Sequence, residues 1–327
     1  MLDTPSFTGY AQCMDTTITK IRAVATASNG GKRLAVVERE APAPQAGETL
    51  IAPSRIGVNF IEVLQRRGSY PVPPGTVLGF EAVGTAPDGR RCAVIDVFGT
   101  YAQRIAVPSS KLIPVPDDVS DDQAMLLFQG VTAHSMIATA HPIRAGEIAL
   151  VYAAAGGVGS ILMQVIKAAG ARPIGVVSSE AKATPLRERG YEVLIGDGTD
   201  TRLLREAVPE GAHVAFDPNG AATWELTLES MRPRGHIVLF GAASGQVPPF
   251  PPSLLQERHS LTVSYCSIFD HIGDPEERRA RTDAVFGWLR SGTVVPLPFH
   301  TFPLERANDA LDFLESRRST GKILLLP

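Results

Sequence analysis

A glycine-rich turn near the middle of the chain, Gly156-Gly157-Val158-Gly159, has the residue types of a phosphate-binding loop. The apolar run Ile148–Ala154 precedes it, and a run with helical periodicity follows it. Glycines let backbone N–H groups come close to phosphate oxygens, and the N-terminus of a helix adds a positive dipole end. The order of strand, glycine turn, helix and strand therefore predicts a dinucleotide site, and redox chemistry is the function that it favours first.

This turn matches the fingerprint G-x-G-x-x-G with alanine, Ala154, in the first slot. Alanine still permits a tight turn where its φ is negative. Apolar residues at helical spacing predict a helix over Ser160–Ala169, ended by Gly170, and a second strand is predicted over Ile174–Val177. The residues assigned to coenzyme contacts in the turn are Ala155, Gly156, Gly157, Val158 and Gly159. The alternative is a glycine-rich turn that binds nothing.

The end of the second strand bears on the choice between the two nicotinamide coenzymes. NAD enzymes usually carry Asp or Glu about 20 residues past the glycines, where it binds the ribose 2′-hydroxyl. This chain has Ser178, Ser179 and Lys182 there, and hydroxyls with an ammonium group suit a 2′-phosphate. We therefore predict NADPH over NADH. Glu180 is a counter-signal if it turns inward, and Lys182 has the alternative of a solvated charge at a helix start.

Composition excludes several classes of protein. The chain has 327 residues, enough for two domains, and its formal net charge of −3 argues against a nucleic-acid surface. Its 3 cysteines, Cys13, Cys92 and Cys266, form no C-x-x-C pair, and such sparse use suits a reducing cytosol. There is no apolar run of the roughly 18 residues that a membrane span needs. Residues 1–20 lack a signal-peptide segment, and we expect a loosely ordered extension there, with Met14 as an alternative start.

The predicted elements divide the chain into two parts. Short β-like runs broken by Gly and Pro fill Ile21–Val115, and Pro114–Asp118 is a natural joint. The strands expected in this part are Leu34–Val37, Thr49–Ile56, Val77–Thr85, Cys92–Phe98 and Tyr101–Val107. Ser120 is expected to cap a helix running to about Phe128, and another helix is expected after Thr132. The strands expected beyond the joint are Ile148–Ala154, Ile174–Val177, Glu192–Ile195, Val214–Phe216, His236–Phe240 and Leu261–Tyr265. Six strands that alternate with helices predict a doubly wound parallel sheet. Helices over Glu276–Leu289 and Glu305–Glu315 and a terminal strand over Lys322–Leu326 follow.

Several short motifs together resemble one family. They are Arg55–Glu62, Leu78–Gly84, Gly130-Val131-Thr132-Ala133, Ala153–Gly159, Thr223-Trp224-Glu225, Arg234-Gly235, Phe240-Gly241, Ser244-Gly245 and Gly321-Lys322-Ile323-Leu324. Over residues 20 to 327 the chain resembles the zinc-independent quinone oxidoreductases, the zeta-crystallin type, of the medium-chain dehydrogenase/reductase superfamily.

That resemblance implies an α/β fold with a GroES-like β-barrel catalytic domain, a doubly wound parallel-sheet Rossmann domain and a cleft between them. The bounds that we expect are residues 1–20 for the extension, 21–119 and 267–327 for the catalytic domain, and 120–266 for the NADP-binding domain. The resemblance also implies that the C-terminal segment rejoins the catalytic domain. It further implies a homodimer that pairs the last Rossmann strand, Leu261–Ser264, edge to edge.

No zinc site is predicted. The zinc relatives use an early cysteine, a G-H-E histidine and a four-cysteine lobe, and a zinc site needs three or four such donors. Here the G-H-E slot holds Phe80, the early cysteine position holds Asn59, and only Pro87–Ala93 stands where the lobe would be. His134 and His141 are seven apart, a spacing more often found on an ordinary helix surface. Without such a Lewis acid, we expect hydride delivery from NADPH to a quinone or an α,β-unsaturated carbonyl.

The resemblance places two candidate catalytic residues in the cleft, Asn59 and Tyr70. Asn59 would donate to the substrate or hold the nicotinamide ribose, and a turn-forming role after a strand is equally open. Tyr70 would donate to the enolate or quinol oxygen, although the Pro71–Pro74 segment after it offers its ring a packing surface instead. For Glu81, a buried structural carboxylate is favoured over a catalytic one.

Further coenzyme contacts are implied for Thr132, Phe240, Gly241 and Lys322. The alternatives are a helix-initiating hydroxyl for Thr132, plain core for Phe240 or Gly241, and a solvated charge for Lys322. Many relatives place a 2′-phosphate-binding tyrosine after the third strand, where this chain has Gly196 and Asp197. An enoyl reductase of a biosynthetic pathway shares every motif, and the crystallin connection also allows a non-catalytic NADPH-binding protein.

Overall fold

A computed structural model of the protein describes residues 19–28, 31–196 and 201–327. The chain folds into two compact units. The first contains the described residues up to Met125 together with Thr301–Arg317 and Ile323–Pro327, and the second contains the described residues of Leu126–His300 with Arg318–Lys322. Among the described helices, none is both long and apolar enough to cross a lipid bilayer.

A six-stranded parallel sheet forms the centre of the second unit. Its strands are β8 (Ile148–Tyr152), β9 (Arg172–Val177), β10 (Glu192–Ile195), β11 (Ala212–Asp217), β12 (Met231–Leu239) and β13 (Thr262–Tyr265). They lie in the order β10-β9-β8-β11-β12-β13, so the chain starts in the middle and winds outward in both directions. This order is that of a dinucleotide-binding doubly wound sheet, and it confirms the predicted fold class of this half.

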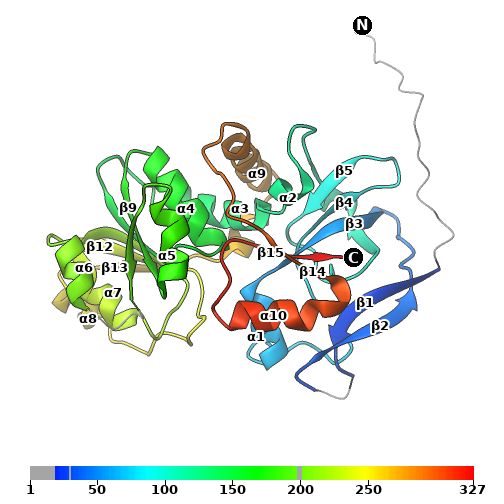
Figure 1. Ribbon diagram of the computed structural model, residues 1–327, viewed down its shortest axis with the longest axis horizontal. Coiled ribbons are helices and arrows are strands. Elements are labelled where there is room, and N and C mark those ends of the chain that lie inside the picture. Colours follow the sequence, from blue (N-terminus) through cyan, green and yellow to red (C-terminus); the bar gives the residue numbers. More distant parts are fainter. Residues whose placement is uncertain (1–18, 29–30, 197–200) are drawn as a thin grey trace, which may run out of the picture. The chain divides into compact units, whose positions relative to one another are not determined.

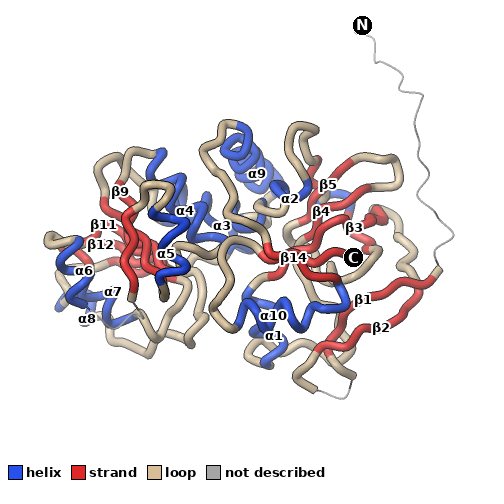
Figure 2. Tube along the Cα trace, viewed as in Figure 1, coloured by secondary structure: helices blue, strands red, loops and turns tan. Residues whose placement is uncertain are grey.

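Helices precede, separate and follow these strands, as the blue and red segments of Figure 2 show. They are α3 (Leu127–Ser135), η2 (Met136–Ala140), α4 (Gly157–Ala168), α5 (Glu180–Arg187), α6 (Thr201–Ala207), α7 (Trp224–Ser230), α8 (Ser253–Glu257), η3 (Ile268–His271) and α9 (Pro275–Arg290). The central strands are apolar throughout, and β8 has Ala149, Leu150 and Val151 fully buried. Such continuous apolar runs are typical of parallel strands covered on both faces.

The first unit contains a seven-stranded sheet and a separate two-stranded antiparallel sheet. Its strands are β1 (Lys20–Thr26), β2 (Leu34–Glu40), β3 (Glu48–Val58), β4 (Ala82–Thr85), β5 (Arg91–Val94), β6 (Ile105–Pro108), β7 (Ile113–Pro114), β14 (His300–Pro303) and β15 (Ile323–Leu326). The long strand β3 pairs with β4, β6 and β15, each antiparallel. The two expected strands Val77–Thr85 and Tyr101–Val107 are shorter in the structure, and the strand Lys20–Thr26 was missing from the prediction.

The C-terminal part of the chain returns to the first unit, where β15 pairs with β3. The helices of this unit are α1 (Phe60–Arg67), α2 (Asp121–Ala124) and α10 (Ala307–Glu315), with single 3₁₀ turns η1 (Ser109–Lys111) and η4 (Leu304–Arg306). Helices α1 and α10 lie side by side in Figure 1. The largely buried guanidinium group of Arg66 in α1 forms ion pairs with Asp312 at 2.6 Å and Glu315 at 2.5 Å, both in α10. These ion pairs link the two helices.

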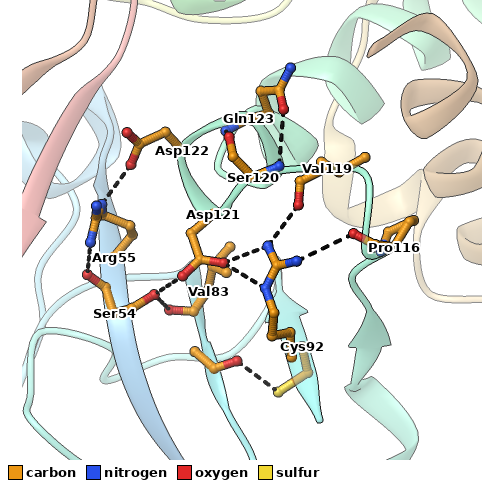
Figure 3. Close-up of polar contacts among 12 residues, drawn as sticks. Ser54, Arg55, Val83, Cys92, Pro116, Val119, Ser120, Asp121, Asp122 and Gln123 are labelled. Atoms are coloured by element: carbon orange, nitrogen blue, oxygen red, sulfur yellow. Dashed lines mark hydrogen bonds and ion pairs between the residues drawn. The ribbon is translucent and has the colours of Figure 1, made fainter. Parts of the chain in front are cut away.

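The first unit extends past residue 119, the expected end of its N-terminal part, because polar contacts hold helix α2 on its sheet (Figure 3). Asp121 accepts hydrogen bonds from Ser54 Oγ at 2.5 Å and from Arg91 at 2.6 Å, and Arg55 pairs with Asp122 at 2.6 Å. Burial raises the pKa of Asp121, but the bonds from Ser54 and Arg91 outweigh it, so the pKa lies below its ordinary value.

The other expected boundary, residue 267, also differs from the observed division. Residues up to His300 stay with the second unit, because helix α9 packs on α3. Arg281 of α9 is buried and donates to His134 at 3.1 Å and to Thr139 at 2.9 Å. A side chain on Gly130 would overlap Val285, so the glycine lets the two helices come close together.

Candidate functional site

The glycine turn joins β8 to α4 at the carboxyl edge of the parallel sheet, where ligands of doubly wound proteins bind. Ala153 has a positive φ of 50°, and the N–H of Gly156 donates to its carbonyl at 2.8 Å. Gly156 is the N-cap of α4, and no side chain among the described residues caps this end of the helix. The first N–H groups of a helix have no intrahelical acceptor, so those of Gly157, Val158 and Gly159 form a cradle for an anion.

At each glycine of the turn, a neighbouring residue limits the space for a side chain. A Cβ on Gly159 would overlap the carbonyl of Ala153, so Gly159 lets the helix start close behind the strand. A Cβ on Gly156 would lie 3.2 Å from the oxygen of Ala153, and one on Gly157 would lie 3.0 Å from Gln129 Cγ. A side chain at any of these three positions would fill space in or beside the cradle. The predicted helix start at Ser160 was three residues late, since the turn of glycines is already helical.

The C-terminal segment lies against this turn. The N–H of Gly321 donates to the carbonyl of Ala155 at 2.7 Å, and Gly156 and Gly321 form an isolated β-bridge. The next residue, Lys322, is only 2% exposed, and its carbonyl accepts from the N–H of His300 at 3.0 Å. The alternative of a solvated lysine is therefore wrong, because Lys322 is buried beside the turn.

The residues predicted to choose the coenzyme lie at the start of α5. Ser178 is exposed, Ser179 is the N-cap of α5, and Lys182 is half-buried in its first turn. The counter-signal Glu180 is bound by Arg187 at 2.8 and 3.0 Å along the outside of the same helix. Gly196 donates its N–H to Val177 at 2.9 Å, while Asp197 lies outside the described residues.

Thr132 does not open a helix, contrary to the expectation. It lies inside α3, which begins at Leu127, and its hydroxyl donates to the carbonyl of Phe128 at 2.7 Å. The sequence suggested a helix boundary at Gly130. In the structure Gly130 lies inside α3, and its missing side chain leaves room for Val285 of α9.

Phe240 and Gly241 directly follow β12, at the carboxyl edge of the sheet as expected. The N–H of Phe240 donates to the carbonyl of Asp217 at 3.0 Å, at the end of the neighbouring strand β11. A Cβ on Gly241 would lie 2.6 Å from the carbonyl oxygen of Pro218, so its missing side chain already has a packing reason. Both residues therefore lie at the carboxyl edge of the parallel sheet, and the loops that follow β11 and β12 pack closely against each other.

In the first unit, Asn59 lies between β3, which ends at Val58, and α1, which begins at Phe60, and it is the N-cap of α1. Its backbone N–H donates to Glu62 at 2.8 Å, and its side-chain Nδ2 donates to Glu81 Oε1 at 2.8 Å. Glu81 is 1% exposed, so the favoured interpretation of a buried carboxyl group agrees with its position. The turn-forming role of Asn59 is also present, because Asn59 and Glu62 form a capping box.

Tyr70 follows the end of α1, where Gly68 adopts the left-handed conformation with φ 83°. Its N–H donates to the carbonyl of Leu64 at 3.2 Å, and its side chain is 44% exposed. A residue this exposed contributes little to the core of the unit.

The described residues contain no group of three or more His, Cys, Asp or Glu side chains placed to hold a metal ion. Phe80, in the slot of a zinc-binding histidine, packs edge-on against Phe98 with ring centroids 5.2 Å apart. Burial raises the pKa of Cys92 and of Cys266 to about 11, which disfavours the thiolate form that metals bind.

Sequence reasoning missed two features of this site. One is the bond from Asn59 to Glu81, which joins residues 22 positions apart. The other is the contact of Gly321 with the glycine turn. Gly57, two residues before Asn59, is the sequence signal that could have indicated the bond from Asn59 to Glu81, because its missing side chain leaves the space that Glu81 fills.

Comparison with known proteins agrees with this geometry. Residues 157–280 match the family model for zinc-binding dehydrogenases. A quinone oxidoreductase of Pseudomonas aeruginosa is 32% identical over 319 residues, 92% of this chain and 98% of the relative. A 2-haloacrylate reductase of a Burkholderia species is 31% identical over 87% of this chain and 92% of the relative.

Solved structures give the same result. The quinone oxidoreductase of Escherichia coli, solved in complex with NADPH, superimposes with a TM-score of 0.88 at 30% identity. A mycobacterial protein complexed with NADPH superimposes with a TM-score of 0.89 at 33% identity. Each alignment covers 94% of this chain and 100% of the other chain. The protein is thus an oxidoreductase, and it belongs to the quinone oxidoreductase family of the medium-chain dehydrogenase/reductase superfamily.

Proposed function

We propose that the protein is an NADPH-dependent, zinc-independent reductase that delivers hydride to a quinone or an α,β-unsaturated carbonyl compound. The observation that carries this proposal is the uncapped N-terminus of α4 in its glycine turn, at the carboxyl edge of a sheet with the dinucleotide-binding strand order. The two solved relatives in complex with NADPH support the same coenzyme.

The residues of the turn suit a pyrophosphate. Backbone N–H groups at residues 157–159 supply donors, and the absence of side chains at the three glycines leaves room for close approach. In this proposal Ala155 to Gly159 hold the pyrophosphate, and Thr132, Phe240, Gly241 and Lys322 line the remainder of the coenzyme site.

NADPH is favoured over NADH because the one carboxylate at the start of α5, that of Glu180, is engaged by Arg187 on the outside of the helix. This leaves hydroxyls and the Lys182 ammonium group as the described side chains at the end of β9. Those groups attract the 2′-phosphate of NADPH and offer no acceptor charge to a 2′-hydroxyl.

Bound NADPH supplies the hydride, and the chain supplies orientation and hydrogen bonds. A conjugated acceptor moves the incoming negative charge onto its oxygen, which needs donors rather than a metal ion. The Asn59 amide and the hydroxyl of the exposed Tyr70 are the donors that we assign to this role. The 2-haloacrylate reductase among the relatives favours a conjugated carbonyl acceptor as much as a quinone, and an enoyl reductase of a biosynthetic pathway is the second candidate.

The protein is also proposed to act in the cytoplasm as a homodimer. Strand β13 ends the parallel sheet and pairs only with β12 among the described strands, so its outer edge can add a strand from a second copy. An edge of this kind is normally covered in a folded protein, and sedimentation velocity measures whether a dimer forms.

A panel of quinones and enones tests the function. We expect the purified protein to oxidise NADPH steadily with members of this panel and to contain no stoichiometric zinc. Binding of NADPH without turnover of any acceptor would favour a non-catalytic NADPH-binding protein. Activity that is lost on chelation and restored by zinc would refute the zinc-independent part of the proposal.

A further inference from the structure

Asn59 is held from two sides. Its backbone N–H donates to Glu62, within α1, and its side-chain Nδ2 donates to Glu81 Oε1 at 2.8 Å. An asparagine amide has a donor end and an acceptor end that differ only in hydrogen bonding. The carboxyl oxygen of Glu81 fixes the donor end of the Asn59 amide, on the side opposite the backbone of Glu62 with which Asn59 forms its capping box.

Glu81 is itself fixed in place. It is 1% exposed, and it directly precedes β4 next to the buried Ala82. Its carbonyl accepts from the N–H of Gly57 at 3.2 Å, on the adjacent strand β3. A Cβ on Gly57 would overlap the carboxyl group of Glu81, so the glycine provides the space in which this group reaches Asn59.

We propose that Glu81 is a positioning residue, which holds the Asn59 amide in the orientation used for the coenzyme or the substrate, with Gly57 as the residue that makes room for it. This inference rests on the proposed function, because Asn59, the residue that Glu81 positions, is placed at the reacting groups by that proposal. Glu81 acts through Asn59 and does not touch the reacting atoms.

The same geometry explains why Gly57, Asn59 and Glu81 occur together. Asn59 directly follows β3 with an extended backbone (φ −125°, ψ 164°), so its side chain lies on the same face of the chain as Gly57, two residues earlier. Glu81 reaches across from the neighbouring chain segment to the space above Gly57 and to the amide of Asn59. Misplacing a substrate-positioning group by about 1 Å can cost about 100-fold in rate, so a small rotation of the amide is sufficient to matter.

The direct test is spectroscopic and uses the coenzyme-free protein. A side-chain amide bonded to a buried carboxyl group exchanges its hydrogens slowly, so the Asn59 Nδ2 resonances, assigned by their loss in Asn59→Ala, are expected to be protected. Glu81→Leu should abolish this protection, and Glu81→Gln, which retains an acceptor oxygen, should preserve it. Protection that persists in a folded Glu81→Leu protein would overturn the proposal.

Kinetics then test the consequence. Glu81→Leu is expected to lower kcat/KM by about 10- to 100-fold, whereas Glu81→Gln should stay within a few fold of the wild type. Gly57→Ala, which displaces the carboxyl group without changing it, should resemble Glu81→Leu. Thr100→Val replaces a buried side chain of the same unit at nearly constant shape and controls for general disturbance of the core, so its kinetics should not change.

A double-mutant cycle separates positioning from structural support. If Glu81 acts through Asn59, the pair Glu81→Leu/Asn59→Ala loses no more activity than Asn59→Ala alone. Additive losses in kcat/KM would contradict the proposal, as would normal kinetics in a folded Glu81→Leu protein. Normal kinetics in Asn59→Ala would also overturn the positioning role of Glu81. In that case NADPH turnover by the wild type would still support the proposed reductase function. A wild type without any turnover would refute the function alone, because the amide protection is measured without coenzyme.

Discussion

At the scale of single residues, the glycine turn is held by its own neighbours in sequence, whereas Asn59 is held by a distant residue, Glu81. The turn is contiguous, so its residue types and order suffice to predict it. The partner of Asn59 is 22 residues away on another strand, and its place depends on the register of β3 against β4. Lys322 shows the same limit, because its burial depends on how the C-terminal segment lies on the turn.

The coenzyme preference is tested at Lys182. We expect Lys182→Ala to raise the dissociation constant for NADPH by about tenfold, which corresponds to about 1.4 kcal/mol, and to leave that for NADH unchanged. The reason is the loss of one charge-assisted contact to the 2′-phosphate. Lys167→Ala is the matched control, since the Lys167 ammonium group lies over the Tyr191 ring at the other end of α4. An equal loss for both coenzymes would remove Lys182 from phosphate binding.

At the scale of elements, periodicity predicted the strands of the parallel sheet within a few residues, and helix boundaries were harder. Helix α4 begins in the glycines because its N-cap is Gly156, which the pattern of apolar residues does not reveal. Helix α3 continues through Gly130, since the space above that glycine is occupied by α9. In both cases a glycine that lies within the helix was interpreted as lying before its start.

Helix α4 also provides a test of the turn. Gly159→Ala is expected to lower the free energy of unfolding by about 1–3 kcal/mol, because the new Cβ meets the backbone of Ala153. It should also weaken NADPH binding, since the helix start must shift. Gly287→Ala in α9, where the Cβ meets nothing within 4 Å, is the control. That change should raise the free energy of unfolding by about 0.5–1 kcal/mol. Unaltered unfolding and coenzyme affinity in Gly159→Ala would argue against a tightly packed turn.

At the scale of the whole molecule, the fold class followed from the alternation of strands and helices, and the division into units did not. The expected boundary at residue 119 came from the proline-containing joint Pro114–Asp118, and that at residue 267 from the end of the sixth predicted strand together with the family resemblance. The observed ones depend on side-chain contacts, namely those of Asp121 with Ser54 and Arg91 and those of Arg281 with His134 and Thr139. Such contacts join distant parts of the sequence and leave no local pattern.

The stability of the whole protein should depend on pH through His236. Burial, and then the neighbouring His141, lowers the pKa of His236 from 6.5 to about 4. Its ring faces His141 at 3.2 Å and Ser264 at 2.8 Å, and His141 in turn faces Glu147. Between these two pKa values the unfolded chain binds a proton that the folded chain does not, so the free energy of unfolding falls as the pH drops from about 6.5 towards 4.

The variant His236→Gln should reduce this slope, which urea unfolding at about pH 7 and about pH 5 measures. Some slope remains, because burial also lowers the pKa of His134, His213 and His300. A slope as steep in the variant as in the wild type would show that His236 is not held neutral.

The most direct test of the central claim follows hydride from coenzyme to product. NADPH that carries deuterium at one face of nicotinamide C4 is mixed with the protein and an enone accepted in the panel, and the product is examined by mass spectrometry. We predict that one face transfers its deuterium to the β-carbon of the enone and the other does not. NADPH consumption with no deuterium in the product from either face would contradict hydride transfer and the function proposed for this chain.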